Sequence, residues 1–153
     1  MSSRLFGNYD HSLDAKGRLN IPAKMRKDLC DEYDEFYVTC YVAIGKDGTE
    51  TNCLAAITSA RWDMILQAAE DLPEEDEADM RIFMARTEKY KLDANGRFIL
   101  TQNQRDYAGL DRDVVIAGMG KRAEIWDAAK WKESQEGKDT AEAALSIKRK
   151  LRI

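Results

Sequence analysis

Apolar and polar positions alternate along this chain in short blocks separated by turn residues. Blocks rich in aromatic and β-branched side chains predict strands. We expect these strands over residues 6–13, 19–21, 35–44, 52–57, 90–92, 114–117 and 122–126. Blocks with apolar residues three or four positions apart, entered through Pro, Thr, Ser or Asp, predict helices. We expect these helices over residues 23–29, from 59 to before Pro73, over 75–86, from Thr101 to near 109, from 128 onward, and over 140–153.

One stretch of this pattern occurs twice. Residues 13–21, Leu-Asp-Ala-Lys-Gly-Arg-Leu-Asn-Ile, return at an offset of 79 as residues 92–100, Leu-Asp-Ala-Asn-Gly-Arg-Phe-Ile-Leu. In each copy an apolar residue precedes an Asp-Ala-x-Gly-Arg turn and an apolar run follows it, which predicts a hairpin of two short strands. A repeat of this length in 153 residues indicates a duplicated structural unit, and we expect an α+β fold of two small halves that share a core.

The repeat and the composition divide the chain into four expected segments. They are a first half over residues 1–72, an acidic helical connection over 73–87, a second half over 88–136, and a basic helix or tail over 137–153. The last segment has three open interpretations, which are a solvated tail, a helix packed on another subunit, and an auxiliary arm that contacts DNA.

The residue types in the repeated loop suggest a use for it. Gly17 can adopt positive φ without steric penalty, and Asp14 can accept hydrogen bonds from backbone N–H groups two residues on. Neither role needs Arg18, whose planar guanidinium could fork onto a phosphate or a guanine edge, or could simply pair with Asp14 to brace the turn. Because the pattern recurs, and Lys16 lies beside it, an anion-facing loop is favoured. The equivalent residues of the second copy are Asp93, Gly96 and Arg97.

Charge is unevenly distributed. The formal net charge of −4 and the pI near 5.2 neither predict nor exclude a nucleic-acid partner, because binding depends on where the cations lie. Residues 13–29 carry five cations against two anions, so the predicted helix after the first loop either extends a positive surface or is an ordinary solvated face. The acidic run 74–77 with Asp79 fits a solvated helix N-terminus better than a calcium loop.

Several function classes find no support in the sequence. No apolar run approaches the roughly 20 residues that cross a bilayer, and Met1-Ser2-Ser3-Arg4 has no apolar core of a secretion signal, so we expect a cytoplasmic protein without a membrane partner. Three cysteines without CxxC spacing predict free thiols rather than metal ligands. His11, the single histidine, lies on a predicted strand, and no phosphate-binding loop or zinc-protease motif occurs. We therefore expect no enzyme activity, cofactor, metal or small-molecule substrate.

The repeated loops and their flanks resemble one known family. Residues 6–9, 13–18 and 21–26 are similar to the first half of the MraZ family of bacterial transcriptional regulators, and residues 92–97, 107–110 and 124–127 are similar to its second half. The resemblance implies two half-barrel units of the AbrB type that pair within one chain, giving a pseudo-twofold duplicated β-barrel with flanking helices. It also implies a ring-like homo-oligomer that binds short direct repeats of double-stranded DNA upstream of the division and cell-wall gene cluster, in the nucleoid.

The resemblance also implies which residues face DNA. These are the loop cations and the basic residues of the helices that follow them, namely Lys16, Arg18, Arg26, Lys27, Arg97 and Arg105. Two departures from the first copy occur in the second. Asn95 replaces the loop lysine, although an amide could still read an adenine, and residues 100–102 replace the Ile-Pro of the first half. We therefore expect the first loop to dominate binding.

Two other functions stay open at this point. An antitoxin-like repressor could use the same fold, although the basic C-terminus differs from the acidic tail by which a toxin would usually be recognised. A ring that binds only proteins is the third possibility, and it would show no preference for an operator.

Overall fold

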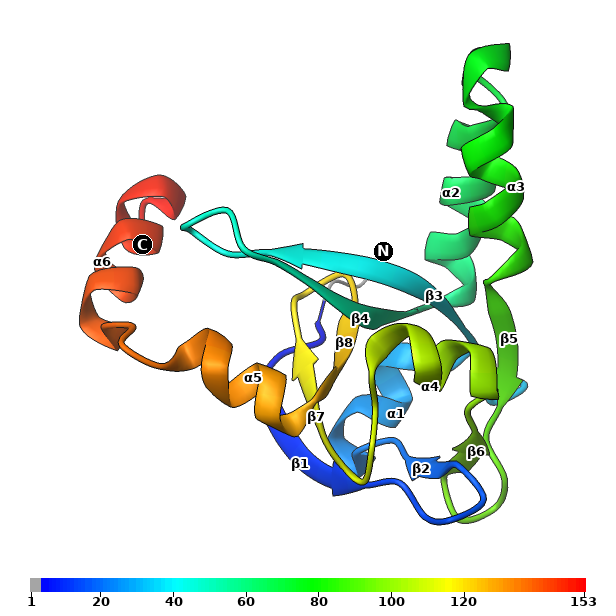
Figure 1. Cartoon of the computed structure of the whole chain (residues 1–153), viewed down its shortest axis with the longest axis horizontal. Helices are drawn as coiled ribbons and strands as arrows, with labels where there is room; N and C mark the ends of the chain where they lie inside the picture. The colour runs from blue at the N-terminus through cyan, green and yellow to red at the C-terminus, as the bar shows by residue number, and fades with distance from the viewer. Residues whose placement is uncertain (1–3) are drawn as a thin grey trace.

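The computed structural model describes residues 4–153, which form a mixed structure of strands and helices around one curled sheet (Figure 1). The strands are β1 (Asn8–Ser12), β2 (Arg18–Asn20), β3 (Glu35–Ile44), β4 (Glu50–Ile57), β5 (Glu88–Lys91), β6 (Arg97–Ile99), β7 (Asp113–Gly118) and β8 (Ala123–Asp127). The helices are α1 (Ala23–Leu29), α2 (Ser59–Ala69), the 3-10 turn η1 (Glu74–Asp76), α3 (Glu77–Ala85), α4 (Gln102–Ala108), α5 (Ala128–Gln135) and α6 (Thr140–Leu151). The predicted α+β fold class is confirmed.

Most elements begin and end close to the predicted residues because their signals are local. Thr58 and Thr101 are the N-caps of α2 and α4, and their hydroxyls accept the N–H groups of Arg61 and Gln104 at 3.0 and 3.2 Å. Helix α4 ends at Gly109, which has a φ of 62° and so takes the left-handed conformation common after a helix. The acidic run starts η1 and α3, as expected of carboxylates at a helix N-terminus.

The prediction that each repeated loop joins a local hairpin is wrong, because the strands before and after each loop do not pair with each other. Instead β1 pairs with β7, β5 pairs with β3, and β2 pairs with β6, where Leu19 lies opposite Phe98. Only the turn itself is closed locally, with the Gly17 N–H donating to the Asp14 carbonyl at 3.0 Å. The apolar residues that flank each turn therefore find their partners in the opposite half of the chain.

The two halves consequently interlock. The larger sheet has the strand order β1-β7-β8-β4-β3-β5, and β2 and β6 form a separate two-stranded ladder. Only the β3–β4 and β7–β8 hairpins stay within one half, whereas the β1–β7, β3–β5, β4–β8 and β2–β6 pairs join the halves. This arrangement is the duplicated barrel that the resemblance implied.

One hydrophobic core is built from both halves. Phe36 of β3 is fully buried and meets Phe98 edge to face, with ring centroids 5.0 Å apart. Tyr90 packs against the same Phe98 ring at 4.8 Å. The remaining large and fully buried side chains come from both halves, among them Leu19, Leu29, Leu54, Leu100, Ile116 and Ile125. Because aromatic and aliphatic surface of each half is buried against the other, the stability of each half depends on the other half.

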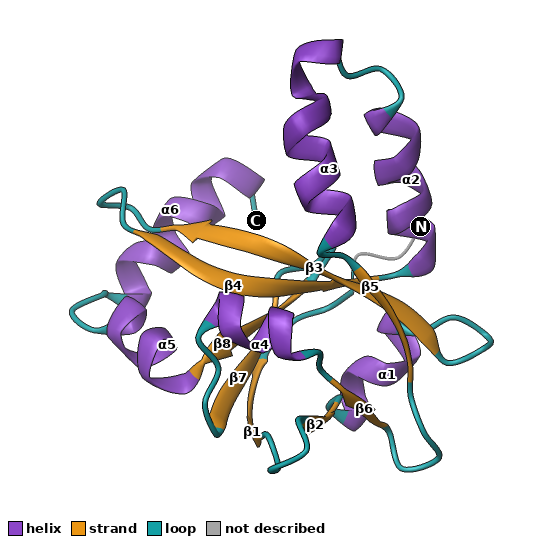
Figure 2. Cartoon of the chain, turned by 45° about the vertical axis from the view of Figure 1, so that its right-hand side comes forward, coloured by secondary structure: helices purple, strands orange, loops and turns teal. Residues whose placement is uncertain are grey.

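Two helical elements project from this barrel at opposite ends (Figures 1 and 2). Helices α2 and α3 form a hairpin whose base is anchored by Trp62, which is 7% exposed and stacks on Tyr37 with centroids 5.2 Å apart. At the other end, Trp131 of α5 meets Trp126 edge to face at 5.3 Å, and α6 follows. Trp62 and Trp131 therefore both anchor helices to the barrel.

The described residues show few groups suited to redox or metal chemistry. Cys30, Cys40 and Cys53 are free thiols, and burial raises the pKa of Cys53 to about 12 and that of Cys30 to about 11. Within residues 4–153 no cluster of three or more His, Cys, Asp or Glu could hold a metal ion. None of the helices in that range is long and apolar enough to span a bilayer. The segment used for the secretion-signal prediction, residues 1–4, lies mostly outside the described residues.

Replacing Phe98 by Ala should lower the free energy of unfolding by roughly 3 to 5 kcal/mol, because the ring is 4% exposed and fills the space between the halves. The matched control is Ile99→Ala on the same strand, where a side chain 57% exposed should cost less than about 1 kcal/mol. Urea unfolding followed by tryptophan fluorescence measures both. Equal losses in the two variants would contradict a shared core centred on Phe98.

Candidate nucleic-acid interface

The two repeated loops, residues 14–18 and 93–97, lie next to each other at one edge of the barrel, beside β2 and β6 (Figures 1 and 2). Each loop is tied to the strand that leaves the other loop. The Leu100 N–H donates to the Gly17 carbonyl, and the Ile21 N–H donates to the Gly96 carbonyl, both at 3.0 Å. The β2–β6 ladder therefore holds the loops as a symmetric pair.

Each loop has the same internal hydrogen bonds. One oxygen of Asp14 accepts the N–H groups of Lys16 and Arg18, both at 2.9 Å. In the second loop Asp93 accepts those of Asn95 and Arg97 at 2.8 and 3.0 Å. The Arg18 N–H, followed by the Arg18 guanidinium, lowers the pKa of the Asp14 carboxyl to about 2, and the Arg97 N–H likewise lowers the pKa of Asp93. Both turns are thus rigid carboxylate-centred loops.

Arg18 and Arg97 take part in bracing these turns while remaining reachable from solvent. The Nε of Arg18 forms a short ion pair with Asp14, and the Nε of Arg97 lies 3.3 Å from Asp93. Their side chains are nevertheless 37% and 35% exposed. Among residues 4–153 no hydrogen bond engages the terminal Nη groups of either arginine. Bracing through Nε therefore leaves the two outer nitrogens available to a phosphate or a base.

Arg26 and Arg105 cross the pseudo-twofold axis to support the opposite loops. Arg26 of α1 donates from Nε to the Ile21 carbonyl at 3.0 Å and from Nη2 to the Asn95 carbonyl at 3.4 Å. Its guanidinium packs so closely on Gly96 that any Cβ there would overlap it. Arg105 of α4 lies in the same way under Gly17, where a Cβ would be 2.8 Å from the guanidinium carbon. These two side chains are half-buried, and each lies where it supports the loop of the opposite half.

The other predicted residues are open to solvent. Lys16 and Asn95 occupy the loop tips, and Lys27 lies on α1, all three exposed. The cross-bracing by Arg26 and Arg105 was missed at the sequence level. A signal for it existed, because the two arginines share the 79-residue offset of the repeat and each loop has a glycine at the contacted position. Whether any of the seven predicted residues touches DNA stays a prediction.

The interlocked halves and paired loops define a duplicated AbrB-like barrel, and comparison with known proteins assigns its family. The family model described as "MraZ protein, putative antitoxin-like" matches residues 5–84 and again residues 82–150. A transcriptional regulator MraZ from Acetivibrio thermocellus is 38% identical over 149 residues, which cover 95% of each chain. Regulators of the same name from Syntrophomonas wolfei and Acidithiobacillus ferrooxidans are 36% identical over 133 residues, covering 85% of this chain and 85% and 87% of theirs.

This chain belongs to the MraZ family. The family consists of transcriptional regulators and not of enzymes, so the chain is a transcriptional regulator, and the predicted absence of enzyme activity agrees with its family.

Replacing Gly96 by Ala should destabilise the protein by roughly 2 to 4 kcal/mol, because the residue has a φ of 77° and a methyl group would collide with Arg26. Gly48→Ala is a matched control. Its φ is 85° but no atom lies within 4 Å of the added methyl, so only backbone strain of about 1 to 2 kcal/mol should appear. Chemical denaturation measures both losses.

A second background isolates the collision with Arg26. In an Arg26→Ala protein the penalty of Gly96→Ala should fall toward that of Gly48→Ala. An unchanged penalty would show that the guanidinium does not rest on this loop.

The depressed pKa of Asp14 predicts a pH dependence of stability. Since the folded-state pKa of about 2 lies below the ordinary 3.8, the ionised carboxylate stabilises the fold above about pH 4, and this contribution is lost as the pH falls toward 2. Asp14→Asn should therefore make the unfolding free energy decline less steeply over that window. Urea unfolding at pH 7, 4 and 2.5 measures it, and an equal decline in both proteins would contradict the assignment.

Proposed function

We propose that this chain is a sequence-specific DNA-binding regulator whose paired loops contact double-stranded DNA. The observation that carries the proposal is the pair of Asp-Ala-x-Gly-Arg loops held side by side, with arginine side chains that are 37% and 35% exposed. The outer nitrogens of Arg18 and Arg97 would contact phosphates or guanine edges, and Lys16 would add a phosphate contact at the loop tip. Backbone bracing from beneath keeps these groups in position before DNA arrives, which reduces the ordering cost of binding.

The first loop would supply most of the binding energy. Its tip carries Lys16 where the second loop has Asn95, and α1 carries Lys24 and Lys27 where the equivalent positions of α4 are Asn103 and Asp106. Each neutralised phosphate adds roughly one unit to the salt dependence of binding, so the first loop should dominate that dependence. Arg26 and Arg105 would contribute chiefly by supporting the loops, because their guanidinium groups are held against Gly96 and Gly17.

One pair of loops offers few contacts, so high affinity would come from repetition. A ring-like homo-oligomer that presents one loop pair per subunit would bind short direct repeats together and gain avidity without new contacts. The resemblance to the MraZ family favours promoters of the division and cell-wall gene cluster as targets. The corresponding location is the cytoplasm, at the nucleoid.

A second candidate is an antitoxin-like repressor, favoured by the antitoxin-like character that the matching family model names. The C-terminal region disfavours the antitoxin function. Helix α6 carries Lys148, Arg149 and Lys150 in its last turn, where an antitoxin would be expected to have an acidic partner-binding tail. A ring that binds only proteins is the alternative that titration with DNA tests directly. Co-purification of a tightly bound toxin from the native host would favour the antitoxin function.

Arg18→Ala should weaken binding to the operator by roughly 1 to 3 kcal/mol for each engaged loop and reduce the salt slope by about one unit per loop. Arg18→Lys keeps the charge but not the fork, so it should retain non-specific binding while discriminating less between operator and unrelated DNA. Fluorescence anisotropy at two salt concentrations, with operator fragments selected from the host genome, measures both.

The control is Arg81→Ala, which removes the same charge from an exposed position on α3, far from the loops. It should leave operator affinity nearly unchanged. If Arg18→Ala assembles normally and binds the operator as tightly as the wild-type protein, Arg18 does not contact DNA.

A further inference from the structure

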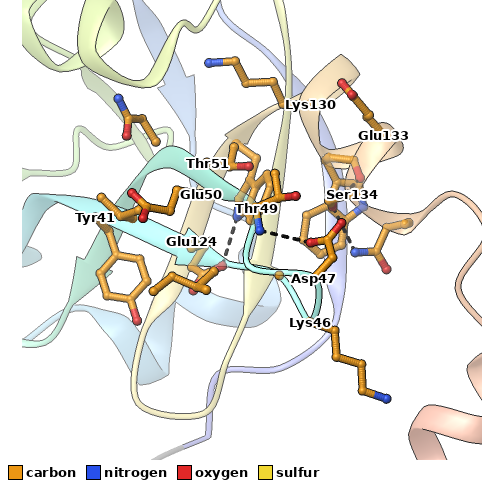
Figure 3. Close-up of a pocket in the computed structure, with 18 of the residues that line it drawn as sticks. Tyr41, Lys46, Asp47, Thr49, Glu50, Thr51, Glu124, Lys130, Glu133 and Ser134 are labelled. Atoms are coloured by element: carbon orange, nitrogen blue, oxygen red, sulfur yellow. Dashed lines mark hydrogen bonds between the residues drawn. The ribbon is translucent and has the colours of Figure 1, made fainter.

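Three polar side chains are buried among residues 4–153, those of Thr39, Gln104 and Glu124. Glu124 lies in the wall of an open groove of about 940 Å³ between the β3–β4 hairpin and α5 (Figure 3). Both of its oxygens are engaged there, one by the Arg122 guanidinium at 2.9 Å and the other by the Trp126 indole N–H at 3.0 Å. Glu124 therefore finds its partners on or beside one strand, β8. Gln104 of α4, by contrast, joins elements that are far apart in the sequence.

The Gln104 amide uses both of its N–H groups inside the protein. Its Nε2 donates to the Val38 carbonyl of β3 at 2.9 Å and to the Arg86 carbonyl at the end of α3 at 3.0 Å. Its Oε1 accepts the Tyr90 hydroxyl at 2.8 Å, and the same hydroxyl accepts the Thr101 N–H at 3.1 Å. The side chain is 1% exposed, so loss of any of these bonds would leave a buried polar group unpaired. The network thus fixes α4 against β3 and α3.

The residue that follows Gln104 is Arg105, which packs under the first loop. A Cβ at Gly17 would be 2.8 Å from its guanidinium carbon, but its Nε is buried and has no hydrogen-bond partner among the described residues. Arg26, at the equivalent position of the first half, instead donates to two backbone carbonyls, one of them in the second loop. Since Arg105 supports the first loop by packing, its position is decided by where α4 lies.

The two halves hold these helices by different means. Met25 is the equivalent of Gln104 at the offset of 79, and it is 2% exposed in the apolar core. Helix α1 follows Pro22 without a side-chain cap, whereas the Thr101 hydroxyl caps α4. Because Arg26 is itself hydrogen-bonded to the loop that it supports, α1 needs no polar anchor for that purpose. The support of the first loop, in contrast, depends on the anchor of α4.

We propose that Gln104 is a positioning residue for the first loop and acts through Arg105. By anchoring α4 to β3 and to the end of α3, its amide keeps the Arg105 guanidinium beneath Gly17, and that contact holds the loop with Arg18 at its exit. The inference rests on the proposed function, in which the first loop supplies most of the binding energy. It gives that loop a support that lies in the core and touches no DNA.

Gln104→Met tests the anchor without DNA, because methionine has a similar volume and is the residue of the first half at this position. Each loop is closed by one equivalent bond, from the Gly17 N–H to the Asp14 carbonyl and from the Gly96 N–H to the Asp93 carbonyl, both at 3.0 Å. In the variant the first loop should open more often, so the acceleration of amide exchange at Gly17 should exceed that at Gly96 roughly tenfold. Hydrogen exchange followed by NMR measures both amides.

The consequence for DNA is measured with the operator fragments of the proposed function. Gln104→Met should weaken operator binding roughly tenfold and lower the salt slope by about one unit per loop, since phosphate contacts of the first loop are lost. In an Arg18→Ala or an Arg105→Ala background the same substitution should change the affinity by less than about twofold, because the contact that it supports is already missing. In an Arg97→Ala background the roughly tenfold loss should persist.

The matched control is Ile125→Val, a small change at a fully buried site of β8 outside the Gln104 contacts. It should lower the stability without changing the salt slope. Urea unfolding and circular dichroism establish that every variant is folded under the conditions of the assays. Equal acceleration of exchange at Gly17 and Gly96 would overturn the proposal, because Gln104 would then stabilise only the fold as a whole. Equal losses of affinity in the Arg18→Ala and Arg97→Ala backgrounds would overturn it as well.

The exchange experiment separates this inference from the proposed function, because it uses no DNA. If the wild-type protein shows no operator preference, the DNA-binding proposal fails, while selective acceleration at Gly17 still establishes Gln104 as the anchor of the first loop. If the wild-type protein binds its operator but Gln104→Met neither loosens the first loop nor weakens binding, the inference fails and the DNA-binding proposal stands.

Discussion

The short ladder between β2 and β6 is the contact on which the two halves and both loops depend. It places Leu19 opposite Phe98 in the core and lets each loop glycine carbonyl accept an N–H from the strand that leaves the other loop. Because these strands are only three residues long, their stability comes from the aromatic and aliphatic surface buried beneath them rather than from hydrogen bonds alone. Neither loop could hold its place without the opposite half.

The arginines of the two repeats have two different roles, since one pair supports the loops and the other pair is accessible to solvent. Arg26 and Arg105 fill the space under the opposite loops, where each half-buried guanidinium packs against a loop glycine and Arg26 also donates to the Ile21 and Asn95 carbonyls. Arg18 and Arg97 each place Nε on an aspartate while the side chain stays 37% and 35% exposed, respectively. A cationic residue near the site is therefore not in itself a sign of ligand contact. Its neighbours decide which role it has.

The acidic overall charge becomes understandable once the charges are placed in space. The carboxylates concentrate on the α2–α3 hairpin, while cations gather around the first loop, on α1 and on α6. A chain with a net charge of −4 can thus present a positive first loop at one edge.

Turn chemistry, helix caps and the repeat were readable from the residues because they depend on neighbours within a few positions. Gly17 with Asp14 predicted the turn, Thr58 or Ser59 and Thr101 predicted helix starts, and the 79-residue offset predicted a duplicated unit. Strand pairing was not readable, since the same apolar pattern serves a local hairpin or a partner 79 residues away equally well. Cross-half burial of Leu19 and Phe98 selected the distant partner, and with it placed Arg26 and Arg105 beneath the loops of the opposite half.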